Sequence, residues 1–271
     1  MSITILASIF VAIGLSAQAP AAKAPARNTG AERLEFMKES ARSYTLAIGR
    51  DQKTVLKLQS DPVFRLGNQG DGMLLEGAIF LWTDEVGRPG AAAQLFLIKI
   101  TGPPESEWRH EFTLLSTGAL TASQGDKPRW QPTDPGVRFQ PIPGAPRPAD
   151  KPQQRLRQMR ELAAEFRAQD DFWGRGWSAL RLLPTPISRY GKTGGTPEDG
   201  ALFAFVLATD PEIFLFIEAR PRANALEWQY AFAPMTCWAL KAEYKGHSVW
   251  SLPLRSTDDP SKPFFDRTDR P

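Results

Sequence analysis

The stretch DGALFAFVLATDP at residues 199–211 has a counterpart earlier in the chain, DGMLLEGAIFLWTD at residues 71–84. Both open with Asp-Gly, continue with an apolar run and then reach Thr-Asp. Further matches lie beyond them, among them Glu107-Trp108 with Glu227-Trp228, at spacings between 120 and 128 residues. The spacing changes only across stretches rich in Gly, Pro, Asn and Asp, where surface loops tolerate insertions. We therefore predict two tandem copies of one domain.

Each copy begins with apolar residues at helical spacing, in 29–47 and again after Asp150. Thr29 and Glu32 form a capping box in the first helix, and Pro152 lies in the first turn of the second. Roughly five antiparallel strands follow, near 54–59, 62–67, 73–83, 92–101 and 107–116 in the first copy. The predicted fold class is α+β. It consists of two tandem copies of a helix followed by a roughly five-stranded antiparallel meander, packed as one unit, with a cystatin-like or NTF2-like plan by analogy.

Two runs in the second copy, at 201–208 and 213–217, are apolar without alternation. This pattern is typical of central strands that are covered on both faces. Because one helix covers one face of a sheet, the other face needs the sister copy or the proline-rich segment between the copies. We expect a buried interface lined by sheets, with Trp130 or Phe139 at its rim.

The N-terminus has the pattern of a secretory signal peptide. An apolar stretch from Ile3 to Leu15 precedes Ala17-Gln18-Ala19, a small-x-small cleavage pattern. The stretch is shorter than the ~20 residues that span a bilayer. We expect export to the periplasm or the exterior, with a mature chain from near Pro20 and no stable membrane span after signal removal. A retained anchor and a buried first element are the alternatives.

Composition shifts along the chain predict its remaining boundaries. A proline occurs every few positions in 127–152, which favours an extended, semi-rigid strap, and the chain becomes polar and charged after residue 254. The expected division is a signal peptide at 1–19, a first α+β repeat at 20–126, the proline-rich strap at 127–152, a second α+β repeat at 153–254 and a flexible C-terminal tail at 255–271.

Charge and composition exclude several classes of function. The chain is 42% hydrophobic and 23% charged, which is typical of a globular protein. Its formal net charge of +3 comes from 33 basic and 30 acidic residues, and the arginines are scattered. Because a phosphate-binding surface needs clustered Lys and Arg, we expect no nucleic-acid partner.

Few residues are candidates for catalysis, and the weak candidates are Glu107, Glu227 and His110. The first two occupy matching positions in the copies, whereas an acid/base pair normally needs two different environments. His110 matches Tyr230, which favours packing over proton transfer. The chain has two distant histidines and the single Cys237, so no zinc-ligand spacing exists, and no cofactor is expected.

Three stretches carry a resemblance to a known group: DGALFAFVLATDPEIFLFIEAR, the preceding LRLLPTPISRY, and the strap ending PGVRFQPIPGAPRPA. They resemble a family of uncharacterised exported proteins of planctomycete bacteria. The resemblance implies export and a duplicated domain of unknown function. It brings no known activity, ligand or catalytic residue.

The leading functional hypothesis is an exported, non-catalytic binding or structural protein of the cell envelope, with an unknown protein or saccharide ligand. One alternative is a hydrolase of envelope polysaccharide or peptide that uses Glu107, Glu227 or His110 as acid/base. Another is a carbohydrate-binding module, which would need a line of exposed rings among the eight tryptophans. The sequence does not indicate an oligomeric state.

Overall fold

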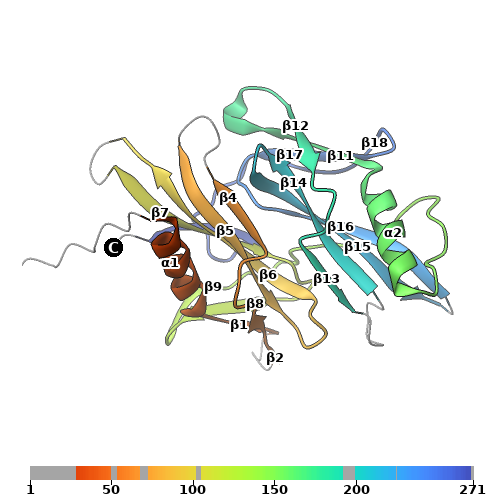
Figure 1. The fold of residues 1–271 in the computed structure, drawn as a ribbon, viewed down its shortest axis with the longest axis horizontal. Coiled ribbons are helices and arrows are strands. Elements are labelled where there is room, and N and C mark those ends of the chain that lie inside the picture. Colours follow the sequence, from red (N-terminus) through yellow and green to blue (C-terminus); the bar gives the residue numbers. More distant parts are fainter. Residues whose placement is uncertain are drawn as a thin grey trace, which may run out of the picture.

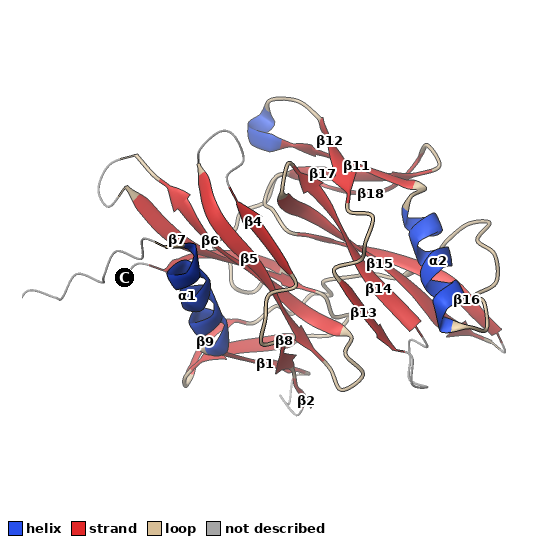
Figure 2. Cartoon of the chain, viewed as in Figure 1, coloured by secondary structure: helices blue, strands red, loops and turns tan. Residues whose placement is uncertain are grey.

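The computed structural model describes residues 29–49, 54–67, 73–101, 105–191, 199–223 and 225–269. Strands dominate these ranges, which contain two α-helices and nineteen strands in three sheets (Figures 1 and 2). The predicted antiparallel pairing is confirmed. The expected signal peptide at 1–19 and the Asp71-Gly72 pair lie outside the described residues. Neither helix in the described ranges has the length and apolar character that crossing a membrane requires.

The two helices begin as their local sequences predict. In α1 (Gly30–Arg42), Thr29 Oγ1 accepts from the Glu32 N–H and Glu32 Oε2 accepts from the Thr29 N–H, at 3.2 and 3.1 Å. This confirms the capping box. In α2 (Pro152–Ala163), the proline occupies the first turn, where its missing N–H leaves no unpaired donor.

The first half of the fold, residues 29–130, contributes to two sheets. The larger has the order β19-β7-β6-β5-β3, with β4 also paired to β5, and the smaller has the order β2-β1-β8-β9. Both sheets and α1 enclose one core, which includes Met37, Phe80 and Trp130. The strands of these sheets are β1 (Tyr44–Ile48), β2 (Thr54–Val55), β3 (Lys57–Leu58), β4 (Phe64–Gly67), β5 (Leu74–Thr83), β6 (Pro89–Lys99), β7 (Ser106–Leu114), β8 (Leu120–Gln124), β9 (Lys127–Trp130) and β19 (Phe264–Asp269).

The second half, residues 152–252, forms a nine-stranded sheet together with β10, in the order β10-β16-β15-β14-β12-β11-β17-β18, and β13 pairs with β14. This sheet curls into a half-barrel, which brings Trp250 of β18 onto Phe232 of β16 with ring centroids 5.2 Å apart. Met159 and Leu162 of α2 pack into its core. Its strands are β10 (Gln140–Pro141), β11 (Phe166–Asp171), β12 (Ser178–Leu182), β13 (Ser188–Gly191), β14 (Asp199–Leu207), β15 (Asp210–Arg222), β16 (Ala225–Pro234), β17 (Ala239–Tyr244) and β18 (His247–Leu252); η1 (Phe172–Gly174) follows β11.

Two strands join the halves, because each pairs with a strand that lies far from it in the sequence. β10, in the expected strap, pairs with β16, where Gln140 lies opposite Tyr230. β19, in the expected C-terminal tail, pairs with β7, where Arg267 lies opposite His110. Both strands cover an edge of their sheet, which protects backbone N–H and C=O groups that an open edge would expose.

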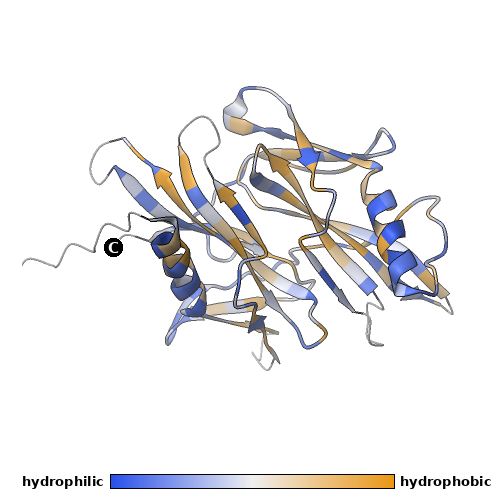
Figure 3. Ribbon diagram, in the orientation of Figure 1, coloured by the Kyte–Doolittle hydropathy of each residue, from blue (hydrophilic) through white to orange (hydrophobic). Residues whose placement is uncertain are grey.

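The six-stranded and nine-stranded sheets also share a core. Ile79 and Leu81 of β5 pack in one cluster with Leu202, Phe214 and Phe216 of β14 and β15. β14 and β15 lie in the interior of their sheet, as their uninterrupted apolar runs predict, and Figure 3 shows orange residues along them. Phe139 packs against the shared core, whereas Trp130 lies in the core of the first half.

The predicted fold class is wrong. The chain is mostly β, and its described part does not follow two tandem copies of a helix and a five-stranded α+β meander. Segment 44–48, expected to end the first helix, is β1, because Tyr44, Thr45 and Ile48 favour an extended backbone and pair with β8. Short polar strands such as β8, β9, β17 and β18 were also missed. β8 and β9 form one hairpin and β17 and β18 another, and β8 and β17 pair in addition with β1 and β11. Their polar residues give no apolar run, so pairing rather than the side-chain pattern makes them strands.

Candidate functional site

A cavity of about 480 Å³ lies at the open side of the half-barrel. Strands β16 and β18 form one wall. Segment 135–140, from the expected strap, and segment 255–264, from the expected tail, cover the cavity. Such a volume suits a small organic molecule. The lining residues are Pro135, Gly136, Arg138, Gln140, Tyr230, Phe232, Pro234, Val249, Trp250, Leu252, Arg255, Ser256, Asp259, Lys262, Pro263 and Phe264.

The walls of the cavity are mainly aromatic and aliphatic. Phe232 and Trp250 stack with an interplanar angle of 28°, which gives two adjacent rings from opposite ends of the curled sheet. Tyr230 is oriented by its hydroxyl, which donates to Gln140 Oε1 of β10 at 3.1 Å. Phe264 contributes a further ring from the start of β19. These surfaces favour an apolar or aromatic ligand.

Arg255 is the principal charged group on the cavity wall. Its Nη1 and Nη2 atoms donate to the backbone carbonyls of Pro253 and Thr236, and its buried Nε has no hydrogen-bond partner. Within the described ranges no carboxylate forms an ion pair with it. Burial lowers the pKa of this guanidinium to about 10, so it remains a cation at neutral pH. An anionic group in the cavity would supply the missing counter-charge.

The charged groups nearer the mouth of the cavity also carry a net positive charge. Arg138 and Lys262 are exposed, so the lining residues include three cations with Arg255 and one carboxylate, Asp259. Asp259 already accepts from the Ser261 N–H and hydroxyl, at 2.9 and 2.7 Å. The electrostatic potential of the cavity therefore favours anions.

An aromatic cluster in the first half is closed by the C-terminal segment. Trp130, which is 0% exposed, donates from Nε1 to the Lys262 carbonyl at 2.8 Å. It packs on Phe112 of β7 with ring centroids 5.6 Å apart, and Phe265 of β19 stacks on Phe112 at 6.5 Å. Trp250, by contrast, is half-buried and lines the cavity. β19 therefore closes the first half, while the shorter β10 leaves the second half accessible.

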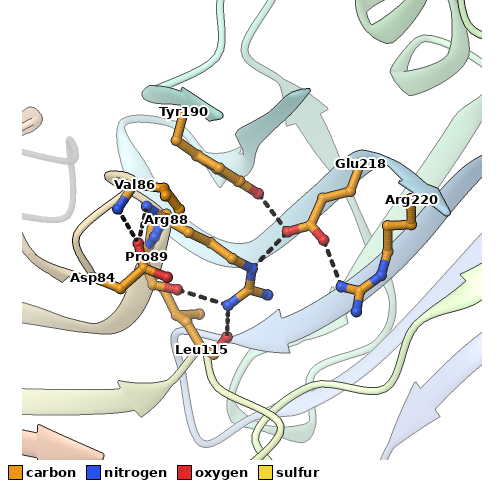
Figure 4. A network of polar contacts seen from close by, with 8 residues as sticks. All are labelled: Asp84, Val86, Arg88, Pro89, Leu115, Tyr190, Glu218 and Arg220. Atoms are coloured by element: carbon orange, nitrogen blue, oxygen red, sulfur yellow. Dashed lines mark hydrogen bonds and ion pairs between the residues drawn. The ribbon is translucent and has the colours of Figure 1, made fainter. Parts of the chain in front are cut away.

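A second polar cluster lies buried between the halves (Figure 4). Glu218, which is 0% exposed, accepts from Arg88 Nε, Tyr190 Oη and Arg220 Nη1 at 2.8, 2.7 and 2.7 Å. Burial, together with the Glu218 carboxylate, raises the pKa of Tyr190 well above its usual range. Arg88 and Arg220 also lie 5.4 and 4.3 Å from the centroid of the Phe139 ring. These contacts satisfy the carboxylate and connect the sheets, so the cluster is structural.

Buried carboxyl groups form a third cluster near the shared interface. Burial raises the pKa of Glu111 and of Glu212 well above the usual range, and the nearby Asp210 carboxylate raises both further. Burial also raises the pKa of Asp170 to about 6. None of these residues lines the cavity. In the part of the chain that the structure describes, no group of three or more His, Cys, Asp or Glu side chains could hold a metal ion.

The structure places the three predicted catalytic candidates apart. Glu107 accepts from Arg109 Nη1 at 2.9 Å, and Glu227 accepts from Arg222 Nη1 at 2.9 Å in the other half. His110 is fully buried, with its Nδ1 2.8 Å from the Tyr44 hydroxyl. Glu107 and His110 are three residues apart on β7 and therefore lie on opposite faces of the strand. None of the three lines the cavity.

Sequence reasoning missed the cavity because the segments that cover it were expected to be linker or tail. Arg138 lies in the expected strap, and Arg255, Lys262 and Phe264 lie in the expected tail. The aromatic and basic residues within these segments were the one feature of the sequence that could have indicated a binding site there.

Comparison of the chain with protein-family models, with curated proteins and with solved structures gives no match. The resemblance to exported planctomycete proteins therefore stays a prediction. Function has to be inferred from the geometry.

Proposed function

We propose that this protein is an exported, non-catalytic binding protein whose cavity holds a small apolar or aromatic molecule with one acidic group. Export rests on the apolar stretch from Ile3 to Leu15 and the Ala17-Gln18-Ala19 pattern that follows it. Binding rests on the cavity of about 480 Å³ between β16 and β18.

The observation that carries the proposal is the position of Arg255. Its guanidinium lies in an aromatic wall, donates to carbonyl oxygens and has no carboxylate partner in the described ranges. A half-buried cation without a counter-ion is unfavourable, and a bound carboxylate, sulfonate or phosphate would relieve this cost. The rings of Phe232, Trp250 and Phe264 would cover the apolar part of the same ligand.

The lining residues support binding rather than catalysis. They include the hydroxyls of Ser256 and Tyr230, the carboxylate of Asp259 and the amine of Lys262, but no histidine or cysteine that could act as base or thiol nucleophile. Glu107, Glu227 and His110, the candidates for a hydrolase, lie elsewhere.

Two fluorescent probes that differ by one charge test the proposal. 8-Anilinonaphthalene-1-sulfonate carries a sulfonate, and N-phenyl-1-naphthylamine has the same rings without it. We expect Arg255→Met to weaken binding of the sulfonate about tenfold to a hundredfold, because a charge-assisted hydrogen bond contributes about 1.5–3 kcal/mol. Binding of the neutral probe should change less than about twofold. Trp250→Ala should weaken both probes.

The matched control is Arg160→Met, which removes an exposed cation from α2. It should leave both affinities unchanged, and far-ultraviolet circular dichroism should show that every variant is folded. If Arg255→Met weakens binding of the two probes equally, the proposed contact between Arg255 and an acidic group of the ligand is wrong. If the folded protein binds neither probe, or if Trp250→Ala binds both as the parent does, the cavity is not the binding site.

A further inference from the structure

The turn between β11 and β12 exposes a cluster of aromatic rings. Residues 171–177 read DFWGRGW, and Trp173 and Trp177 are 51% and 45% exposed. They are the two exposed tryptophans in the described ranges, whereas Trp82, Trp130 and Trp228 are buried. The short helix in this turn projects at the top of the molecule beside β12 (Figure 2). None of these residues lines the cavity described above.

The backbone of this turn holds Trp173 in an uncommon conformation. Its φ of 61° and ψ of 17° lie in the left-handed region, which is rare for a bulky L-residue and is unfavourable. Asp171 Oδ1 accepts from the Gly176 N–H at 2.8 Å, and the Arg175 N–H donates to the Phe172 carbonyl at 3.2 Å. The turn is therefore closed by its own hydrogen bonds, with the indole directed outward.

Strand β17 and the residue before it support the exposed rings. Trp173 packs on Trp238 with centroids 4.8 Å apart, and Phe172 packs edge-on against Trp238 at 5.3 Å. Lys241 Nζ lies 4.1 Å from the centroid of the Trp177 ring. These contacts hold one side of each exposed indole and leave the rest of it in contact with solvent.

The groups around the rings are predominantly cationic. Arg175 is exposed between the two tryptophans, and Lys241 lies against Trp177. The one carboxylate within 171–177, Asp171, already accepts the Gly176 N–H. The surface thus combines exposed indoles with positive charge.

We propose that this aromatic tip, defined as Trp173, Arg175, Trp177 and Lys241, is a contact site for a bilayer surface that carries anionic phospholipids. Indole rings favour the headgroup region, where the apolar ring is shielded and the N–H stays hydrated. Arg and Lys beside them are attracted to the lipid phosphates. A turn that is closed by its own hydrogen bonds presents the rings without a large loss of conformational entropy.

A saccharide is the competing occupant and fits the charges less well. Sugar hydroxyls both donate and accept, so a saccharide site needs acceptors as well as donors around its aromatic rings. The tip offers the cationic donors of Arg175 and Lys241, and the carboxylate of Asp171 is engaged. Charge complementarity therefore favours an anionic surface.

Vesicle binding by the full chain tests the proposal. Vesicles of phosphatidylcholine alone are compared with vesicles that also contain phosphatidylglycerol, and both carry brominated acyl chains that quench indole fluorescence. We expect sedimentation with the anionic vesicles and quenching on contact. Lys241→Glu should weaken binding about tenfold or more, since each surface cation contributes on the order of 1 kcal/mol. The double variant Trp173→Phe, Trp177→Phe should retain folding and lose most of the quenching.

The control Val55→Ala removes an exposed apolar side chain on β2 and should bind as the parent does. Every variant retains the apolar segment from Ile3 to Leu15, so differences among them report on the tip alone. The proposal is overturned if the chain does not sediment with anionic vesicles, or if the Lys241→Glu and double variants bind and are quenched as the parent is. Retention on alginate or dextran that is lost in the double variant, without vesicle binding, would identify a saccharide site instead. The probe experiments on the cavity do not depend on either result.

Discussion

Arg88, in the turn between β5 and β6, donates from Nε to Glu218 Oε1 of β15 at 2.8 Å, across the interface between the two larger sheets. The Asp84 carboxylate positions Arg88 by accepting its N–H at 2.8 Å. The guanidinium also lies 5.0 Å from the centroid of the Phe216 ring. The positive charge of Arg88, in the first half, is thereby paired with the buried Glu218 carboxylate of the second half.

Removing that carboxylate should destabilise the whole protein. In Glu218→Gln, Arg88 and Arg220 both lose their buried counter-charge, and we expect the free energy of unfolding to fall by about 3–5 kcal/mol. Glu227→Gln is the matched control, because its pair with Arg222 is at the surface, where ion pairs contribute little to stability. Urea denaturation measures both. Equal losses would show that the interface network contributes no more than a surface pair.

Asp170 should make stability depend on pH between about 4 and 6. It is 0% exposed, neither carboxylate oxygen is hydrogen-bonded, and burial raises its pKa to about 6. Because the folded pKa lies above the usual ~3.9, its contribution is fully present below about pH 4 and is lost as the pH rises through 6. Asp170→Asn should therefore stabilise the protein by about 1–3 kcal/mol at pH 7.5 and have little effect at pH 4.

The comparison requires denaturation curves for parent and variant at both pH values. Asp134→Asn, at an exposed position, serves as the control and should change neither curve. A stabilisation by Asp170→Asn that is equal at pH 4 and pH 7.5 would contradict the assignment of the effect to ionisation of Asp170.

Cys237 should react slowly with alkylating agents. Burial, assisted by the nearby Glu111 carboxyl, raises the pKa of its thiol to about 11. At pH 8 the thiolate fraction is therefore small, and its higher nucleophilicity compensates only in part. We expect iodoacetamide to modify native Cys237 at least about tenfold more slowly than a free thiol, as followed by mass spectrometry. Modification in urea should be fast, and a native rate equal to that of the free thiol would refute the predicted shift.

The C-terminal strand should be required for stability. Ending the chain at Pro263 removes β19, whose Phe264 and Phe265 are buried and whose Asp266 pairs with Arg109. The loss of two buried phenylalanines alone predicts a destabilisation of about 3–6 kcal/mol. Ending the chain at Asp269 should have little effect. A synthetic peptide of residues 260–271 should restore part of the stability of the shortened chain, because β7 would again have a pairing partner.

If the chain ending at Pro263 unfolds at the same urea concentration as the parent, then the pairing of β19 with β7 does not contribute to the fold. Such a result would support the original expectation of a flexible tail at 255–271. Hydrogen exchange of the Phe264–Asp269 amides in the parent provides an independent measurement, with slow exchange expected for those that donate to β7.

The sequence alone was sufficient to predict the features that depend on residues close to one another in the chain. The capping box of Thr29 and Glu32 and the proline at the start of α2 involve residues within one helical turn, and both are confirmed. The interior positions of β14 and β15 also followed from their own apolar runs, since strands covered on both faces need no polar side.

Tertiary structure decided the features that depend on distant partners. Segments such as β1 and β8 are short and partly polar, and they become strands because each supplies the hydrogen bonds that the other lacks. The same holds for β10 and β19, which lie in segments that looked like linkers until β16 and β7 paired with them. The cavity depends on the placement of both segments, because Arg138 comes from the segment of β10 and Arg255 from the segment that leads to β19. A pairing between segments more than a hundred residues apart, such as β19 with β7, leaves no local pattern in the residues that form it.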